Sequence, residues 1–177
     1  RRYVSDKKEL ARQFLCTDDL GKVLRIEGHI SDPHNKGQTV LILHFQGGRR
    51  LVYKPRGLSP EKVWNQLLHW LNVSWKDRLT VLRVVDRCSY GWMEFAQSNN
   101  IDSRQYYLAA GNLLFLLYLF GIDDMHTENV VVGARGPVIV DLETMMQMSL
   151  PLHEARRAFA SEKLSKRISQ SVLRAGF

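Results

Sequence analysis

Cysteine is scarce in this sequence. The chain contains two, Cys16 and Cys88, and they form no CxxC pair. Two isolated cysteines cannot build a zinc site without many other ligands. A disulfide between them is not excluded, but a reduced cytosolic protein is the simpler interpretation. We therefore predict a cytoplasmic protein.

Long apolar runs are also missing. The longest, residues 113–120, lies between Asn112 and Gly121, whereas a transmembrane helix needs about 20 residues. The chain starts at Arg1 without a methionine and without a signal-peptide pattern. We expect no integral membrane segment, and we expect this chain to be a fragment of a larger enzyme.

No block of five basic residues occurs, although the net charge is +7. The excess of positive charge could favour nucleotide phosphates, nucleic acid or an acidic peptide, or it could simply keep the protein soluble. Because the basic residues are scattered, we predict no nucleic-acid partner. The 45% hydrophobic and 24% charged residues are typical of a globular chain with one domain or two small lobes.

Hydrophobic periodicity predicts the order of the secondary structure. The first part should hold a helix, three strands, a second helix capped by Ser59, and two more strands: 6–16, 23–30, 39–45, 50–54, 60–72, 79–85 and 90–95. The second part should hold a long helix that begins near Asp102 and ends before Gly121. A hairpin of 130–132 with 138–140 and a charged helix over 153–173 should follow.

This order is that of a protein kinase. We predict an α+β, protein-kinase-like fold, with an antiparallel small-lobe sheet and one helix in residues 1–96. Residues 97–177 would begin a helical large lobe, with the catalytic loop and a metal-binding hairpin. The pattern alone fits many α+β folds, so the chemistry of the side chains has to decide between them.

Acidic and amide residues recur at a spacing used for phosphoryl transfer. Asp124 and Asn129 are five residues apart, as in the D-x-x-x-x-N of kinase catalytic loops, and Asp141 follows twelve residues later. Mg²⁺ prefers hard oxygen ligands, which Asn129 and Asp141 supply. The motif alone is common, and Asp141 could equally cap a helix. The joint order nevertheless predicts a magnesium–nucleotide site.

A cation for the nucleotide phosphates is expected at Lys54. It ends the third predicted strand, as the strand-three lysine of kinases does, although a surface lysine is the alternative. Arg56 could assist it or be solvated. Glu61 is a candidate ion-pair partner of Lys54, although it lies early in the second helix.

Several departures from ordinary protein kinases form a pattern of their own. No G-x-G-x-x-G loop is present, no His-Arg precedes Asp124, and Asp141 is followed by Leu142-Glu143 instead of Phe-Gly. With these departures, the sequence resembles the dehydratase domain of class II lanthipeptide synthetases, the LanM family. The resemblance runs through nearly the whole chain, at residues 31–34, 51–56, 70–72, 86–87, 90–95, 124–129, 140–144 and 171–176.

The resemblance implies a two-step activity. Such enzymes use ATP and Mg²⁺ to phosphorylate Ser and Thr of a precursor peptide, which consists of a leader and a core. They then eliminate phosphate to give dehydroalanine and dehydrobutyrine. A separate C-terminal zinc cyclase domain, expected in the full-length enzyme, adds cysteine thiols to these alkenes.

The resemblance also implies roles for individual residues. Lys54 would hold the ATP phosphates, and Asp124 would orient or deprotonate the peptide hydroxyl. His126 would contact the transferred phosphate or assist proton transfer. Asn129 and Asp141 would hold Mg²⁺.

Three further residues receive less definite roles. Glu143 would lie near the metal or the peptide. Asp32 and His34 fall on the loop between the first two strands, where kinases fold their glycine-rich loop over the phosphates. An aspartate there would repel ATP unless it were paired or bound to a metal, so a role in elimination or in the binding of Lys or Arg is expected. His34 could also be an exposed turn histidine.

Two competing functions remain. A small-molecule phosphotransferase of the aminoglycoside-kinase type would share the Asp, Asn and Asp, but it normally has His two residues before the first Asp, where this chain has Ile122. A non-catalytic, pseudokinase-like peptide-binding module would not need Lys54, Asp124, Asn129 and Asp141 together.

Overall fold

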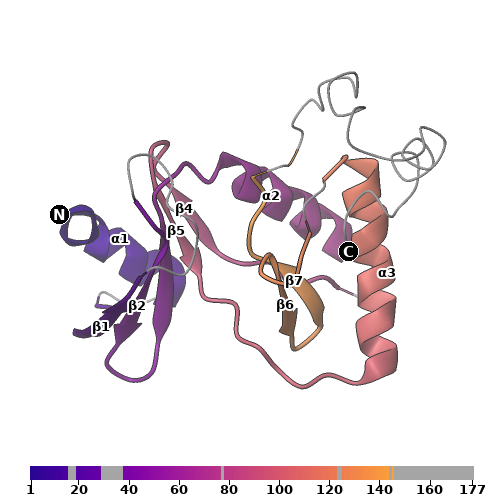
Figure 1. Ribbon diagram of the computed structural model, residues 1–177, viewed down its shortest axis with the longest axis horizontal. Helices are drawn as coiled ribbons and strands as arrows, with labels where there is room; N and C mark the ends of the chain where they lie inside the picture. Colours follow the sequence, from indigo (N-terminus) through magenta and orange to yellow (C-terminus); the bar gives the residue numbers. More distant parts are fainter. Residues whose placement is uncertain (16–18, 29–37, 77, 123–124, 144, 146–177) are drawn as a thin grey trace, which may run out of the picture. The chain divides into compact units, whose positions relative to one another are not determined.

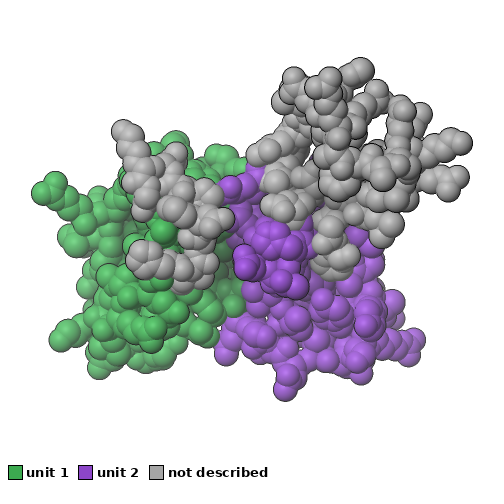
Figure 2. All heavy atoms as spheres, viewed as in Figure 1, with its two compact units in different colours: residues 1–70, 81–96 green, residues 71–80, 97–177 purple. Residues whose placement is uncertain are grey.

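The computed structural model describes residues 1–15, 19–28, 38–76, 78–122, 125–143 and 145. The chain forms two compact units (Figure 2). The first unit consists of residues 1–70 and 81–96, and the second of residues 71–80 and 97–177.

The first unit contains a five-stranded sheet in which every neighbouring pair is antiparallel, with strand order β1-β2-β3-β5-β4. The strands are β1 (Val23–Glu27), β2 (Leu41–Phe45), β3 (Arg50–Lys54), β4 (Val84–Asp86) and β5 (Gly91–Glu94). The predicted α+β class, with an antiparallel small-lobe sheet, is confirmed. β2 and β3 form the predicted hairpin.

The strand predicted over 79–85 is wrong except at its end, since β4 begins at Val84. Asparagine side chains take the backbone groups that a neighbouring strand would have bonded. Asn72 accepts from the Leu79 N–H at 2.9 Å and donates to its carbonyl at 2.8 Å. Asn65 donates to the Leu82 carbonyl.

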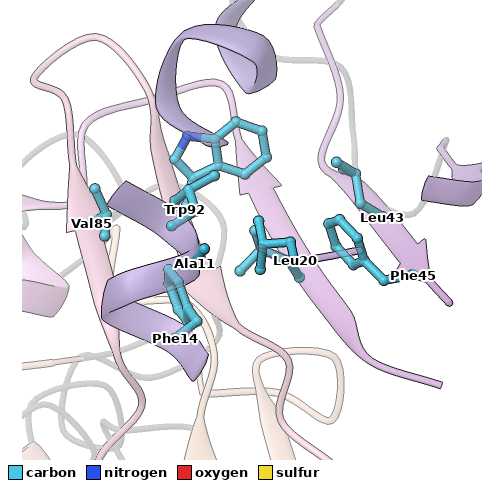
Figure 3. Close-up of a cluster of buried hydrophobic side chains, with 9 residues drawn as sticks. Ala11, Phe14, Leu20, Leu43, Phe45, Val85 and Trp92 are labelled. Carbon is cyan, nitrogen blue, oxygen red and sulfur yellow. The ribbon is translucent and has the colours of Figure 1, made fainter. Parts of the chain in front are cut away.

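Helix α1 (Arg2–Leu15) packs on one face of this sheet and begins four residues earlier than predicted. Its buried side chains meet those of the strands in a single core (Figure 3). That core consists of Leu10, Ala11, Phe14, Leu20, Leu43, Phe45, Leu51, Val85 and Trp92. Asp6 is also buried on α1, and it is satisfied there by hydrogen bonds from Trp92 Nε1 at 2.8 Å and the Tyr90 hydroxyl at 2.9 Å.

The other face of the sheet carries Lys54. Side chains of a strand alternate between the two faces, so Leu51 in the α1 core places Val52 and Lys54 on the opposite side. Helix α2 (Ser59–Ser74) begins one residue before the predicted first helical position, Pro60, and it supplies the ion-pair partner of Lys54.

The second unit contains helix α3 (Ser103–Leu119) and the hairpin of β6 (Val130–Gly133) and β7 (Gly136–Ile139) (Figure 1). The predicted helix bounds are confirmed: the Asp102 side chain accepts from Gln105 N at 3.1 Å, and Gly121 has φ +62° just past the end. The hairpin packs against α3 so closely that a Cβ on Gly136 would lie 2.3 Å from that of Ala109.

No helix among the described residues is long and apolar enough to span a membrane. The helix predicted over 153–173 lies outside the described residues.

Candidate functional site

Lys54 and Glu61 form a buried ion pair in the first unit. Lys54 Nζ lies 3.6 Å from Glu61 Oε1, and each side chain is only 5% exposed. The pair joins the last residue of β3 to the first turn of α2. The expected partnership of Lys54 with Glu61 is therefore confirmed, and the surface-lysine alternative is excluded.

Arg56 shares the same carboxylate. Its guanidinium binds both oxygens of Glu61, with Nη1 at 3.1 Å from Oε2, and Nη1 also donates to the Gly57 carbonyl at 2.9 Å. Its side chain is 17% exposed. Two cations thus converge on one buried acid, which fixes the chain between β3 and α2.

Asp86, at the end of β4, anchors the start of α2. Its Oδ1 accepts from the Leu58 N–H at 2.9 Å, and its Oδ2 accepts from the Ser59 hydroxyl at 2.9 Å. The N–H of Cys88 also donates to Oδ1, at 3.0 Å. The Asp86 carboxylate of β4 therefore accepts hydrogen bonds from donor groups at the start of α2. These bonds hold in place the turn that carries Glu61.

Close approach of two backbones makes this anchor possible. A Cβ on Gly57 would lie 2.3 Å from the Cys88 carbonyl oxygen, and a Cβ on Gly91 would lie 2.4 Å from Leu58 Cγ. Gly91 is also the register partner of Lys54. Leu58, which is fully buried, therefore packs directly beside the strand position of the lysine.

Asp86 and Glu94 are among the carboxylates of this unit whose pKa values are lowered. Burial alone would raise the pKa of Asp86, but the hydrogen bonds from Leu58, Ser59 and Cys88 and the charge of Lys62 lower it overall. Burial would likewise raise the pKa of Glu94, but hydrogen bonds from the Arg83 side chain and backbone outweigh it.

A lowered folded-state pKa predicts acid sensitivity. The stabilisation is present above the ordinary values of 3.8 for Asp86 and 4.5 for Glu94, and it is lost as pH falls through the folded values. We expect the Asp86→Asn/Glu94→Gln variant to be less stable than wild type at neutral pH. This difference in unfolding free energy, measured by urea titration, should shrink below pH 4.5. A difference independent of pH would contradict the prediction.

The second unit brings Asn129 and Asp141 to the same end of the β6–β7 hairpin. The Val140 N–H donates to the Asn129 carbonyl at 2.9 Å, which extends the ladder one pair beyond Val130 and Ile139. Asp141 follows immediately, and its Oδ1 accepts from the Glu143 N–H at 3.2 Å. The three predicted metal residues are thus neighbours in space, although twelve residues separate the first two in sequence.

His126 lies against the same loop. Its Nδ1 is 3.3 Å from the Glu128 N–H nitrogen, and its Nε2 is 3.3 Å from the amide nitrogen of Asn129. A neutral imidazole has one acceptor nitrogen, so the ring can accept only one of these two hydrogen bonds at a time. The ring is exposed.

The donor set at the hairpin suits a hard cation. Asn129 and Asp141 offer an amide and a carboxylate oxygen, and Mg²⁺ usually takes one or two protein carboxylates and fills its remaining positions with water and phosphate oxygens. Among the described residues, no three or more His, Cys, Asp or Glu side chains converge into a metal cage. Asp124, Asp32 and His34 lie outside the described residues.

Comparison with known proteins decides the family. The whole chain, residues 1–177, matches the family described as "Domain of unknown function (DUF4135)". The chain belongs to this family. It is also similar to the lacticin 481/lactococcin biosynthesis protein LcnDR2 of Lactococcus lactis subsp. lactis, with 31% identity over 140 residues. That alignment covers 72% of this chain and 15% of LcnDR2, so the chain spans a small part of its relative's length. The resemblance to class II lanthipeptide synthetases is confirmed.

Within this DUF4135 chain, the structure adds one residue that sequence reasoning missed. Asp86 contacts Ser59 across 27 positions of sequence, and no local pattern links the two. The available signal was weak: an acidic residue ends a predicted strand just before a short turn.

Proposed function

We propose that this DUF4135 chain carries the nucleotide-binding core of a lanthipeptide dehydratase. The full enzyme would phosphorylate Ser and Thr of a precursor peptide with ATP and Mg²⁺ and then eliminate the phosphate. The similarity to a lanthipeptide biosynthesis protein supports a peptide-modifying role. The buried pair of Lys54 and Glu61 is the observation that carries the phosphoryl-transfer chemistry.

A buried ion pair contributes little net stability to a fold, because the free-energy cost of removing two charges from water offsets much of their attraction. In protein kinases, a lysine of the third strand is held by a glutamate of the small-lobe helix, and the lysine then binds the nucleotide phosphates. Lys54 and Glu61 occupy corresponding elements, β3 and α2. This correspondence supports ATP as the ligand of Lys54.

The second unit would supply the metal ligands. Asn129 and Asp141 lie together at the hairpin end, and Mg²⁺ bound there would neutralise negative charge on the phosphates. Glu143 is held next to Asp141 through its backbone, and its own role near the metal or the peptide belongs to the proposal.

The chemistry then needs a base twice. In phosphorylation, the peptide hydroxyl oxygen bonds to the γ-phosphorus, the bond to ADP breaks, and the hydroxyl proton passes to a base, which we assign to Asp124. In elimination, a base takes the Cα proton, the Cβ–O bond breaks, the alkene forms and inorganic phosphate leaves. We assign Asp32 and His34 to this second step and His126 to contact with the transferred phosphate.

Mass spectrometry tests this function directly. The full-length protein, incubated with ATP, Mg²⁺ and a peptide rich in Ser and Thr that also contains Cys, should yield peptide with added phosphate and then peptide that has lost water. Omitting ATP or adding EDTA should abolish both products. Phosphorylated peptide that never loses water would indicate a plain kinase, and unmodified peptide under all conditions would refute the proposal.

A further inference from the structure

A basic pocket of about 280 Å³ lies in the second unit, and its described lining includes no residue to which a catalytic or metal-binding role is assigned above. Its described lining comprises Lys76, Arg78, Gln105, Ala109 and Arg135. Three of these five side chains are cationic, and none is acidic. We call this the basic pocket.

Three segments that are distant in sequence build the basic pocket. Lys76 and Arg78 lie in the chain just after α2, Gln105 and Ala109 lie on the first two turns of α3, and Arg135 lies in the β6–β7 turn. Each segment is held firmly. The two hydrogen bonds between Asn72 and Leu79 close the first one. The contact between Gly136 and Ala109 fixes the turn against the helix.

The charge of the basic pocket is not compensated within the described part of the chain. Lys76, Arg78 and Arg135 have no ion-pair partner there. Arginines elsewhere behave differently: Arg56 pairs with Glu61, and Arg83 pairs with Glu94. Like charges gathered around one pocket repel each other, and an anionic ligand would remove that repulsion.

We infer that the basic pocket binds an acidic segment of the peptide substrate through its carboxylates. This inference rests on the proposed function for the identity of the peptide. The pocket has the volume of about nine water molecules, which suits two acidic side chains of a chain better than a single phosphate ion. Arginine pairs with carboxylate in a bidentate way, and Gln105 can donate to the same groups. A peptide held here would raise the local concentration of its Ser and Thr residues at the chemical site.

Charge reversal tests the basic pocket. The probe is a short fluorescein-labelled peptide rich in Asp and Glu, titrated with the full-length protein and followed by fluorescence anisotropy. The Lys76→Glu/Arg78→Glu/Arg135→Glu variant should bind it at least about tenfold more weakly, since each exposed pair contributes a modest amount. The matched control is Lys8→Glu/Lys22→Glu/Arg49→Glu, which changes the net charge equally at exposed positions of the first unit. It should bind within about twofold of wild type at physiological salt.

Competition separates the possible ligands. Unlabelled acidic peptide should displace the probe, whereas inorganic phosphate, ATP and duplex DNA at equal charge concentration should not. Displacement by phosphate alone, or by DNA alone, would overturn the acidic-peptide assignment, as would equal loss of binding in the two variants.

The failure of this inference is distinguishable from failure of the proposed function. ATP-dependent phosphorylation of a short, non-acidic Ser-containing peptide should be equal in the pocket variant and wild type. Absence of phosphorylation in wild type would count against the function and leave the anisotropy result standing. Unchanged binding of the acidic probe by the pocket variant would refute the pocket, whatever the activity.

Discussion

The Asp141→Asn variant is expected to lose ATP-dependent phosphorylation by about a thousandfold, because a neutral amide is a much poorer ligand for Mg²⁺ than a carboxylate. The substitution is nearly isosteric. The new side-chain amide would keep an oxygen that can accept the Glu143 N–H, so the local turn should survive. The measurement is the rate of phosphate incorporation into the peptide, followed by mass spectrometry over a range of Mg²⁺ concentrations.

A charge-matched control accompanies this variant. Glu128→Gln removes one negative charge from the same loop at an exposed side chain, and it should phosphorylate within about threefold of wild type. Urea titration should show Asp141→Asn to be within about 1 kcal/mol of wild type. Undiminished product from a folded Asp141→Asn protein would remove Asp141 from the metal site.

The second large effect concerns stability and distinguishes the two ends of the buried ion pair. Glu61→Gln should lower the free energy of unfolding by about 3 kcal/mol or more, because Lys54 and Arg56 both lose their shared carboxylate in a buried setting. Lys54→Met should cost much less, about 1 kcal/mol, since Glu61 keeps its bidentate partner Arg56. Urea or guanidinium unfolding measures both values.

The loss of phosphorylation activity should not follow the order of the two stability losses. Both variants are expected to lose phosphorylation, Lys54→Met through the missing phosphate ligand and Glu61→Gln through a displaced lysine. Lys62→Met is the control, because Lys62 is exposed on the same helix turn as Glu61. This substitution should change the free energy of unfolding by at most about 0.5 kcal/mol. Equal destabilisation by Lys54→Met and Glu61→Gln would show that Arg56 does not stabilise the Glu61 carboxylate once Lys54 is removed.

Much of the fold could be predicted because its signals are local. The turn formers between β2 and β3, the capping position of Asp102 and the glycine after α3 each act within a few residues of chain. The strand predicted over 79–85 failed for the opposite reason. Asn65 and Asn72, on a different element, bond the backbone of Leu82 and Leu79, and no pattern within 79–85 reveals this.

For the candidate site, too, the features that depend on local sequence could be predicted, and those that depend on contacts between distant residues could not. The spacing of Asn129 and Asp141, the place of Lys54 after its strand and the departures from ordinary kinases determined the family and the expected chemistry from the sequence alone. Side-chain type and order suffice there, because ligand chemistry depends on which atoms a residue offers.

Only the tertiary structure decided which side chains hold the candidate site residues in place. It showed that Glu61 binds two cations, that Asp86 anchors the turn carrying Glu61, and that Lys76, Arg78 and Arg135 share one pocket. Each of these contacts joins different elements of the fold. Hydrogen bonds and ion pairs act over a few ångströms in space, and folding alone determines which distant residues come within that range.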